Sequence, residues 1–406
     1  MHVTPFGRLF TASTLSNLGD GLRLAALPLL AASLTRDPGA VAVMTAVIWL
    51  PWLLFGAIGG AVVDRVHRVR LLLAVQLGRM AVVGVLALVV WTGNASMPLL
   101  YIAAFLFGIG ELLADTTMHT LVPALVPSER LEQANGRLFA SQSVANEFVG
   151  PPVGSVLFAA VPALPFVGNA LAWAGSAVVL SRLNVTQTHR DGRDPSSLLQ
   201  DIVGGARWLF AHPILRALLV WSMFVNGSIA AFTGIQVLYA LELLGVSEAV
   251  YGFYGAAAGV GGVAGTLLAG RAVRHFGRTR VVMAGSALHG LATLTAGLVP
   301  HPLLFGLLAA LMMAGAALVI IVLGSLRQTI VPSRLLGRVT ATTRVFGYGA
   351  LPLGAVLGGW LASATDLRAP FLLGGVVIVL AGLLIGRWLT PAAIEAATAE
   401  ARASAG

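Results

Sequence analysis

Long apolar stretches, each followed by a short polar segment, make up almost the whole chain. Most are about 20 residues long, the length that an α-helix needs to cross the hydrocarbon core of a bilayer. The pattern therefore predicts an all-α membrane protein with twelve transmembrane helices. These helices are expected near residues 8–33, 41–62, 71–93, 98–120, 137–161, 164–183, 213–241, 250–272, 280–299, 302–326, 339–364 and 369–390.

Related segments recur in the two halves of the chain. Residues 60–70, after the second apolar stretch, align with residues 270–280, after the eighth. Such internal repeats predict two pseudo-symmetric six-helix bundles, the architecture of transporters that bind substrate between their halves. The expected parts are an N-terminal bundle at 1–183, a cytoplasmic linker with an amphipathic helix at 184–212, a C-terminal bundle at 213–390 and a cytoplasmic tail at 391–406.

Composition supports a membrane protein and fixes its expected orientation. Hydrophobic residues make up 57% of the chain and charged residues only 10%, far below the roughly 25% of soluble proteins. All 25 basic residues are arginines, and 19 of them fall in segments that are cytoplasmic if both termini lie inside the cell. Because positively charged loops stay in the cytoplasm, we expect a multi-pass protein of the inner or plasma membrane with this orientation. The net charge of +9 then reflects the inner face and does not indicate a nucleic-acid partner.

A few charged residues fall inside the apolar stretches, where each costs about 2.5–3.5 kcal/mol unless it meets a partner or a cavity. Asp20 and Glu147 are predicted near the middle of the first and fifth helices, beside Asn17 and Asn146. Burial favours the neutral form of a carboxyl group, so both acids are candidate proton sites, and the two asparagines belong to the same predicted cavity.

Asp20 also has a structural alternative. Arg23 lies one turn away, and Arg79 is expected at a similar depth in the third helix. A permanent ion pair would hold Asp20 in its charged form, which does not suit a proton carrier, and both interpretations stay open. Glu147 has no arginine within one turn of its own helix, which favours coupling or contact with a cationic substrate.

Glu111 and Asp115 lie four residues apart on one face of the fourth helix. Like charges at this spacing repel, so either one carboxyl stays protonated or both find basic partners. A role in proton coupling and a role in gating bridges near the inner end of the helix both remain open.

The segment between the second and third helices resembles the loop signature of the major facilitator superfamily. That signature is a glycine, three residues, an aspartate and an arginine, then further basic residues. The matching positions are Gly60, Asp64, Arg65, Arg68 and Arg70, whereas His67 and Val69 depart from the pattern. Residues 123–135 and 16–20 are similar to the branch that contains macrolide-efflux proteins and enterobactin exporters.

This resemblance implies the major facilitator fold and a conformational role for the loop acid. In the superfamily the acid braces the N-terminal bundle against the eleventh helix in the outward-open state. Asp64 would take this role here, with Arg344 near the cytoplasmic end of the eleventh helix as a complementary charge.

A second motif lies in the fifth predicted helix. Antiporters of the superfamily carry Gly-Pro-x-x-Gly there, and Gly150, Pro151 and Gly154 match, although Asn146 stands where the pattern has an upstream glycine. The resemblance implies antiport. The structural alternative is an ordinary seam of close helix packing.

These observations predict a secondary active transporter that exports an amphipathic, drug-like or natural-product molecule by alternating access, in exchange for protons. The expected partners are a small-molecule substrate, protons and the lipid bilayer, and a monomer is expected. No enzyme, cofactor or metal motif is present in the sequence, which contains no cysteine. The acids in the helices favour a neutral or cationic substrate, although Arg23 and Arg79 leave an anionic siderophore-like solute open. The alternatives are uptake or facilitated diffusion of a small metabolite, and a non-transporting membrane receptor or scaffold.

Overall fold

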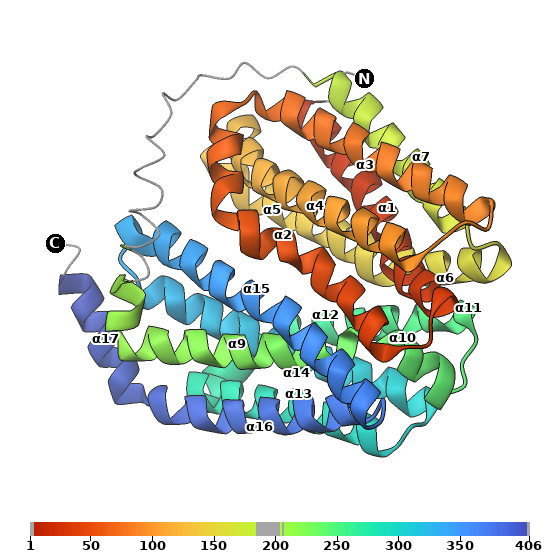
Figure 1. Cartoon of the computed structure of the whole chain (residues 1–406). Coiled ribbons are helices and arrows are strands. Elements are labelled where there is room, and N and C mark those ends of the chain that lie inside the picture. The colour runs from red at the N-terminus through yellow and green to blue at the C-terminus, as the bar shows by residue number, and fades with distance from the viewer. Residues whose placement is uncertain (1–3, 184–203, 205–206, 404–406) are drawn as a thin grey trace. The chain divides into compact units, whose positions relative to one another are not determined.

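The computed structural model describes residues 4–183, 204 and 207–403, apart from the side chains of residues 57–62, 64, 65, 119, 128, 333, 334, 338, 341 and 400–403. The regular elements in these ranges are helices, and no strand occurs among them (Figure 1). The first half contains α1 (Pro5–Leu34), α2 (Pro38–Arg65), α3 (Arg68–Trp91), α4 (Met97–Leu125), η1 (Ser128–Arg130), α5 (Leu131–Ser143), η2 (Val144–Val149), α6 (Gly150–Ala160) and α7 (Leu164–Ser181).

The second half contains α9 (Pro213–Thr233), α10 (Gln236–Leu238), η3 (Tyr239–Leu243), α11 (Glu248–Tyr251), α12 (Phe253–Phe276), α13 (Arg278–Leu298), α14 (Pro302–Ile330), α15 (Ser333–Ala364), α16 (Ala369–Trp388) and α17 (Pro391–Ala403). The all-helical membrane architecture expected from the sequence is confirmed. Most of the predicted linker helix lies outside the described residues.

Ten helices in the described part of the chain are long and apolar enough to cross a membrane. The other two of the twelve predicted spans correspond to α1 and to the succession α5, η2 and α6. Helix α1 has 30 residues, but Asn17, Asp20 and Arg23 lower its hydropathy. The fifth predicted span is divided by the π-helical segment η2, so none of its parts is long enough by itself. In both of these spans, the sequence places polar residues near the middle of the membrane.

The chain divides into two compact units. One unit comprises Met1–Arg193 with Ala240–Ala256, and the other comprises Asp194–Tyr239 with Ala257–Gly406. The segment 240–256 belongs to the first unit because it packs on α6, where the Ser155 hydroxyl donates a hydrogen bond to the Ala249 carbonyl at 3.0 Å. The exact domain boundaries predicted from the repeats stay a prediction.

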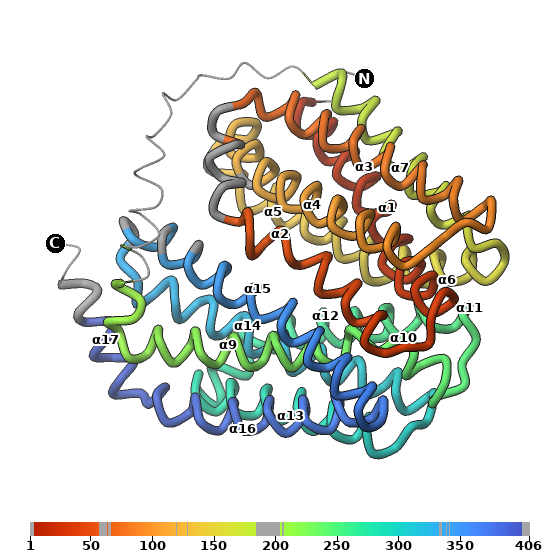
Figure 2. The backbone as a smooth tube through the Cα atoms, in the orientation of Figure 1, coloured from red at the N-terminus to blue at the C-terminus, as the bar shows by residue number. Residues whose placement is uncertain are grey.

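Helix α1 forms the centre of the first unit. It packs against α6 and α7, and α3 in turn packs against α4 and α7, as the backbone trace in Figure 2 shows. At one end of this unit, Leu9 and Ala12 of α1 are buried with Leu72 of α3 and Leu121 of α4. The polar residues of α1 therefore lie on a helix that is enclosed by its neighbours.

In the second unit, α13 packs against α14 and α16, and α9 packs against α15 and α16. Helix α17 was not expected, because its segment was predicted as a tail. It begins after Thr390, whose hydroxyl accepts a hydrogen bond from the Ala393 N–H at 3.2 Å. Its apolar residues Ala393, Ile394 and Ala397 pack on a buried cluster to which α14 contributes, so this helix is part of the bundle.

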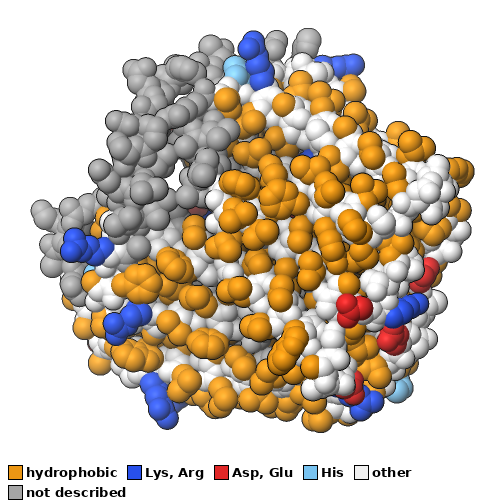
Figure 3. All heavy atoms as spheres, in the orientation of Figure 1, with side chains coloured by type: hydrophobic (Ala, Val, Ile, Leu, Met, Phe, Trp, Pro, Cys, Tyr) orange, Lys and Arg blue, Asp and Glu red, His pale blue; other side chains and the backbone are white. Residues whose placement is uncertain are grey.

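Large apolar side chains cover much of the molecular surface. Leu303 is 83% exposed, Leu267 69% and Trp91 68%. On the face shown in Figure 3, hydrophobic side chains predominate and few charged side chains interrupt them. A soluble protein rarely exposes continuous apolar areas of this kind, so this surface suits lipid.

Candidate functional site

Four charged side chains form a network inside the first unit. The Asp20 carboxylate of α1 accepts hydrogen bonds from Arg79 of α3 and from Arg23, whose Nη2 is 3.2 Å away. Arg23 Nη2 also lies 3.6 Å from Glu111 Oε2 of α4. Both arginine side chains are almost completely buried, at 3% and 4% exposure. Two positive and two negative charges thus balance, as buried charges in a membrane require.

Aromatic rings complete the surroundings of the two arginines. The Arg79 guanidinium lies 4.2 Å from the ring centre of Trp173, and the Arg23 guanidinium lies 4.9 Å from that of Phe107. These distances are within the range of cation–π attraction. Gly110 leaves the space that Arg79 occupies, since a Cβ there would come within 2.6 Å of Arg79 Cγ. The arginines are therefore held by carboxylates and packed against rings.

Glu147 lies in the π-helical segment η2. The Gly150 N–H bonds to the Ala145 carbonyl, five residues back, instead of to the residue four back. Pro151 and Pro152 follow directly, and proline has no N–H to donate to the carbonyls one turn before it. The two prolines thus explain why the helix departs from α geometry at this point. Segments of π-helix occur frequently at functional sites.

The Gly150-Pro151-x-x-Gly154 motif forms a close contact with α1. A Cβ on Gly150 would overlap the backbone of Gly21, and a Cβ on Gly154 would overlap the Leu22 carbonyl. Gly21 in turn leaves room for the Ala145 carbonyl of η2. The motif therefore fixes η2 and α6 directly against the turn of α1 that carries Asp20.

The neighbouring asparagines differ in their contacts. Asn17 Nδ2 lies 3.4 Å from Ser13 Oγ on its own helix. Asn146 Oδ1 is buried and has no hydrogen-bond partner among the described residues. An unsatisfied acceptor beside Glu147 is available to water or to a ligand.

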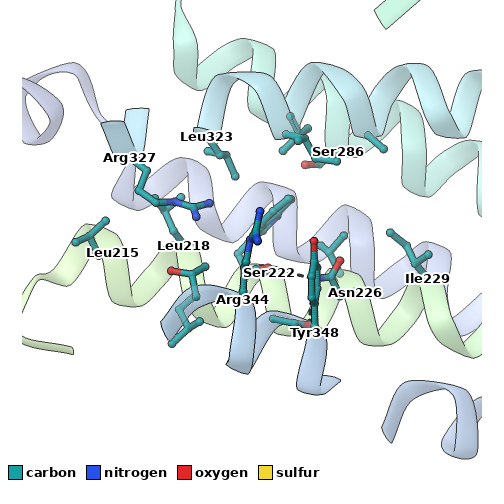
Figure 4. A pocket seen from close by; sticks show the side chains of 18 of the residues that line it. Leu215, Leu218, Ser222, Asn226, Ile229, Ser286, Leu323, Arg327, Arg344 and Tyr348 are labelled. Carbon is teal, nitrogen blue, oxygen red and sulfur yellow. Dashed lines mark hydrogen bonds between the residues drawn. The ribbon is translucent and has the colours of Figure 1, made fainter. Parts of the chain in front are cut away.

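A cavity of about 350 Å³ lies inside the second unit, lined by Leu209 and by residues of α9, α13, α14, α15 and α16. Arg327 from the end of α14 and Arg344 from α15 point into the same space (Figure 4). Ser286, Asn226 and Tyr348 add polar groups further along the cavity. The arrangement offers a positively charged end and a mixed polar and apolar interior.

Comparison with known proteins identifies the family. The profile described as transmembrane secretion effector, a branch of the major facilitator superfamily, matches residues 1–405. The chain belongs to this family. It is accordingly a major facilitator superfamily transporter, and the fold and family expected from the sequence are confirmed.

Relatives of this transporter include drug exporters. It is 29% identical over 380 residues to an uncharacterized MFS-type transporter of Sinorhizobium fredii, covering 92% of each chain. It is 26% identical to the multidrug efflux pump Tap of Mycolicibacterium fortuitum, covering 93% of each, and 23% identical to macrolide efflux protein A of Streptococcus pyogenes, covering 82% of each.

Solved structures show the same fold at low sequence identity. A bacterial homologue of the iron transporter ferroportin, in its inward-facing state, superposes with a TM-score of 0.77 at 16% identity, covering 95% of this chain and 98% of that one. The nucleoside transporter NupG superposes with a TM-score of 0.75 at 12% identity, covering 95% and 100%. These similarities concern the fold alone.

The predicted gating residues of the transporter are only partly described. Gly60, Asp64 and Arg65 lie outside the residues whose side chains the structure describes. Arg68 and Arg70 occupy the first turn of α3, where the His67 ring accepts a hydrogen bond from the Arg70 N–H at 3.4 Å. The bracing role of Asp64 therefore stays a prediction, as do the separate roles of Glu111 and Asp115, which lie one turn apart on α4.

Sequence reasoning missed most of the cavity in the second unit. It did not single out Arg327, and it gave Arg344 only a gating role. Ser286 and Tyr348 were not predicted as site residues, because single polar residues on separate helices do not form a sequence motif. The available signal was the position of Arg327 and Arg344 on consecutive apolar helices, since residues 302–330 and 333–364 contain four arginines and no acid.

Replacing Trp173 with leucine is expected to lower the free energy of unfolding by about 2 kcal/mol, because it removes the ring facing Arg79 and leaves a cavity. Trp173 is completely buried. Thermal unfolding in detergent measures the change, with Trp91→Leu as the matched control, since Trp91 is 68% exposed on the lipid-facing surface. Equal unfolding midpoints for the two variants would contradict a packing role for Trp173.

Proposed function

We propose that this transporter exports an amphipathic drug-like or natural-product molecule in exchange for protons, and that Glu147 carries the proton. The observation behind the proposal is the isolation of this carboxyl group. Glu147 is partly buried, and it forms no ion pair with the described residues of its own unit. A carboxyl group without a permanent counter-ion in a low-dielectric site is free to bind and release a proton.

The contacts of Asp20 favour a structural role over a coupling role. Asp20 faces two buried arginines, and protonation would leave both with a weaker partner. Neutralising Asp20 would leave two buried arginines without their shared counter-charge, which is unfavourable. Of the two leading acids predicted from the sequence, Glu147 is therefore the better proton carrier.

Efflux and orientation are supported by separate observations. The similarity to the Tap pump and to macrolide efflux protein A supports outward transport of organic molecules. The concentration of arginines in segments predicted to be cytoplasmic supports a cell-membrane protein with both termini inside. In this orientation, proton entry would accompany substrate exit through two alternating states.

Replacing Glu147 with glutamine is expected to abolish the pH-gradient-dependent part of transport, because the amide cannot carry a proton. The measurement uses inverted membrane vesicles acidified inside, and follows uptake of erythromycin and ethidium as probes together with the decay of the pH gradient. We expect gradient-driven accumulation to fall about tenfold or more, to the level seen without a gradient.

Glu132→Gln is the matched control for this experiment. Glu132 lies on α5, ahead of the same π-helical segment, but its side chain is exposed, so the same chemical change should leave transport intact. Gradient-driven accumulation in the Glu147→Gln vesicles would exclude Glu147 as the proton site. Uptake that stops at equal concentrations on both sides and needs no pH gradient in either variant would instead support facilitated diffusion.

A further inference from the structure

The cavity in the second unit differs in net charge from the balanced network of the first unit. Arg327 and Arg344 line it, and their charges are close enough to act on each other. None of the described residues that line the cavity is acidic. In the first unit, by contrast, Arg23 and Arg79 are neutralised by carboxylates. Two neighbouring positive charges with no counter-ion among the described residues of their own unit favour the binding of an anion.

Acidic residues are scarce in the described parts of the whole second unit. Asp366 lies in the turn between α15 and α16, where its carboxylate is 4.0 Å from Arg368, and Glu395 lies on α17. Neither residue lines the cavity. The counter-charge for Arg327 and Arg344 therefore has to come from outside the described side chains of this unit.

Unsatisfied polar groups mark a built site in the same cavity. Ser286 is 2% exposed, and its hydroxyl has no hydrogen-bond partner among the described residues. The buried indole N–H of Trp221 also lacks a partner there. Both residues line the cavity, and a buried donor without a partner is unfavourable by about 1–3 kcal/mol. An oxygen atom of a bound ligand would satisfy both groups. Water would do so when no ligand is bound.

Apolar side chains also line the cavity and suit the body of an organic molecule. Leu218, Val225, Ile229, Val319 and Leu323 line the cavity beside the polar groups. Asn226 is already engaged, because its Nδ2 donates to Ser222 Oγ and to the Gly347 carbonyl, each at 3.2 Å. A volume of about 350 Å³ lies in the range of small-molecule sites and is too small for a large polyanion.

We propose that this cavity binds the anionic head, a carboxylate or similar group, of an amphipathic organic molecule, with Arg327 and Arg344 pairing with the head. The proposal rests on the proposed export function and deepens it by assigning a substrate class. It also revises the preference for a neutral or cationic substrate, which the acids of the first unit had suggested. Arginine is well suited to this task because its planar guanidinium group pairs with carboxylates through two parallel hydrogen bonds.

A binding experiment without any ion gradient tests the assignment separately from transport. The full chain is placed in nanodiscs of phosphatidylcholine, and binding of radiolabelled 1-naphthylacetate is compared with that of the neutral isostere 1-naphthylacetamide. We expect saturable binding of the acid and at least about tenfold weaker binding of the amide, since a charged hydrogen-bonded pair is lost.

Variants of the two arginines locate the site. Arg344→Gln and Arg327→Gln should each weaken naphthylacetate binding about tenfold and remove the preference over the amide. Arg344→Lys should retain part of the preference, because it keeps the charge. Arg216→Gln is the matched control, since Arg216 is exposed on α9 and does not line the cavity. Size-exclusion profiles and unfolding midpoints identify any variant that misfolds, and Ser286→Ala then serves as a milder probe with a smaller expected loss.

Several results would overturn the assignment. They are equal affinity for acid and amide, unchanged affinity in both arginine variants, or no saturable binding of the acid up to its solubility limit. Loss of naphthylacetate binding when phosphatidylglycerol is added to the discs would identify a lipid headgroup as the occupant instead. Glu147→Gln should bind the acid normally, so failure of the proton-coupling proposal and failure of this one give different results.

Discussion

Asparagine in place of Asp20 is expected to lower the free energy of unfolding by about 3–5 kcal/mol, because it leaves a buried arginine without its counter-charge. Arg79 is 4% exposed, and Asp20 is its carboxylate partner in the network, whereas Arg23 also has Glu111. The midpoint of thermal unfolding in detergent, followed by fluorescence-detected size exclusion, measures the loss.

Two further variants test the physical reason. Adding Arg79→Gln to Asp20→Asn restores the charge balance and should recover most of the lost stability. Asp366→Asn is the matched control, because Asp366 is 56% exposed and its contact with Arg368 is a surface ion pair, worth less than about 1 kcal/mol. Wild-type stability in the single Asp20 variant would show that the network is dispensable and would return Asp20 to the candidate proton carriers.

Valine in place of Gly154 is expected to destabilise the first unit by about 3 kcal/mol or more, at the upper end for overpacked sites. A Cβ at this position would overlap the backbone carbonyl of Leu22, which cannot rotate away as a side chain would. Helix α6 would have to separate from α1. We expect a lower unfolding midpoint and loss of transport of the erythromycin and ethidium probes.

Gly84→Val provides the matched control for this substitution. Gly84 lies in the membrane-spanning helix α3, and nothing lies within 4 Å of the position that its Cβ would take. Valine there should therefore change stability little. If the two valine variants unfolded alike, the close contact between α6 and α1 would not explain the glycine at position 154.

The positions of the helices could be predicted from sequence because hydrophobicity alone determines which segments can lie in lipid. The first predicted helix, 8–33, corresponds to α1 at Pro5–Leu34, and the last, 369–390, corresponds to α16 at Ala369–Trp388. Hydropathy did not reveal the π-helical segment, because a change of hydrogen-bond register leaves the composition unchanged. It also did not reveal α17, a short amphipathic helix stabilised by packing on α14.

The residues of the candidate site could be predicted from the sequence, but the contacts between their side chains could not. The cost of charge in lipid was sufficient to single out Asp20, Arg79 and Glu147. The choice between an ion pair and a free carboxyl group depends on which helix faces meet, and this information is absent from a single sequence. For the same reason Ser286 and Arg327 could not be linked, since they come from different helices and share a cavity only in the folded bundle.

A shift of the hydrogen-bond register along the π-helical segment would change the direction in which Glu147 points. A π turn holds one residue more than an α turn, and moving that extra residue along the helix rotates the side chains it passes by about 100°. The extra residue of the π turn can move only toward α5. Movement into α6 would need hydrogen bonds that Pro151 and Pro152 cannot donate. Rotation of α5 about its own axis, with α6 held on α1, would turn Glu147 from one side of the helix to another without displacing the bundle.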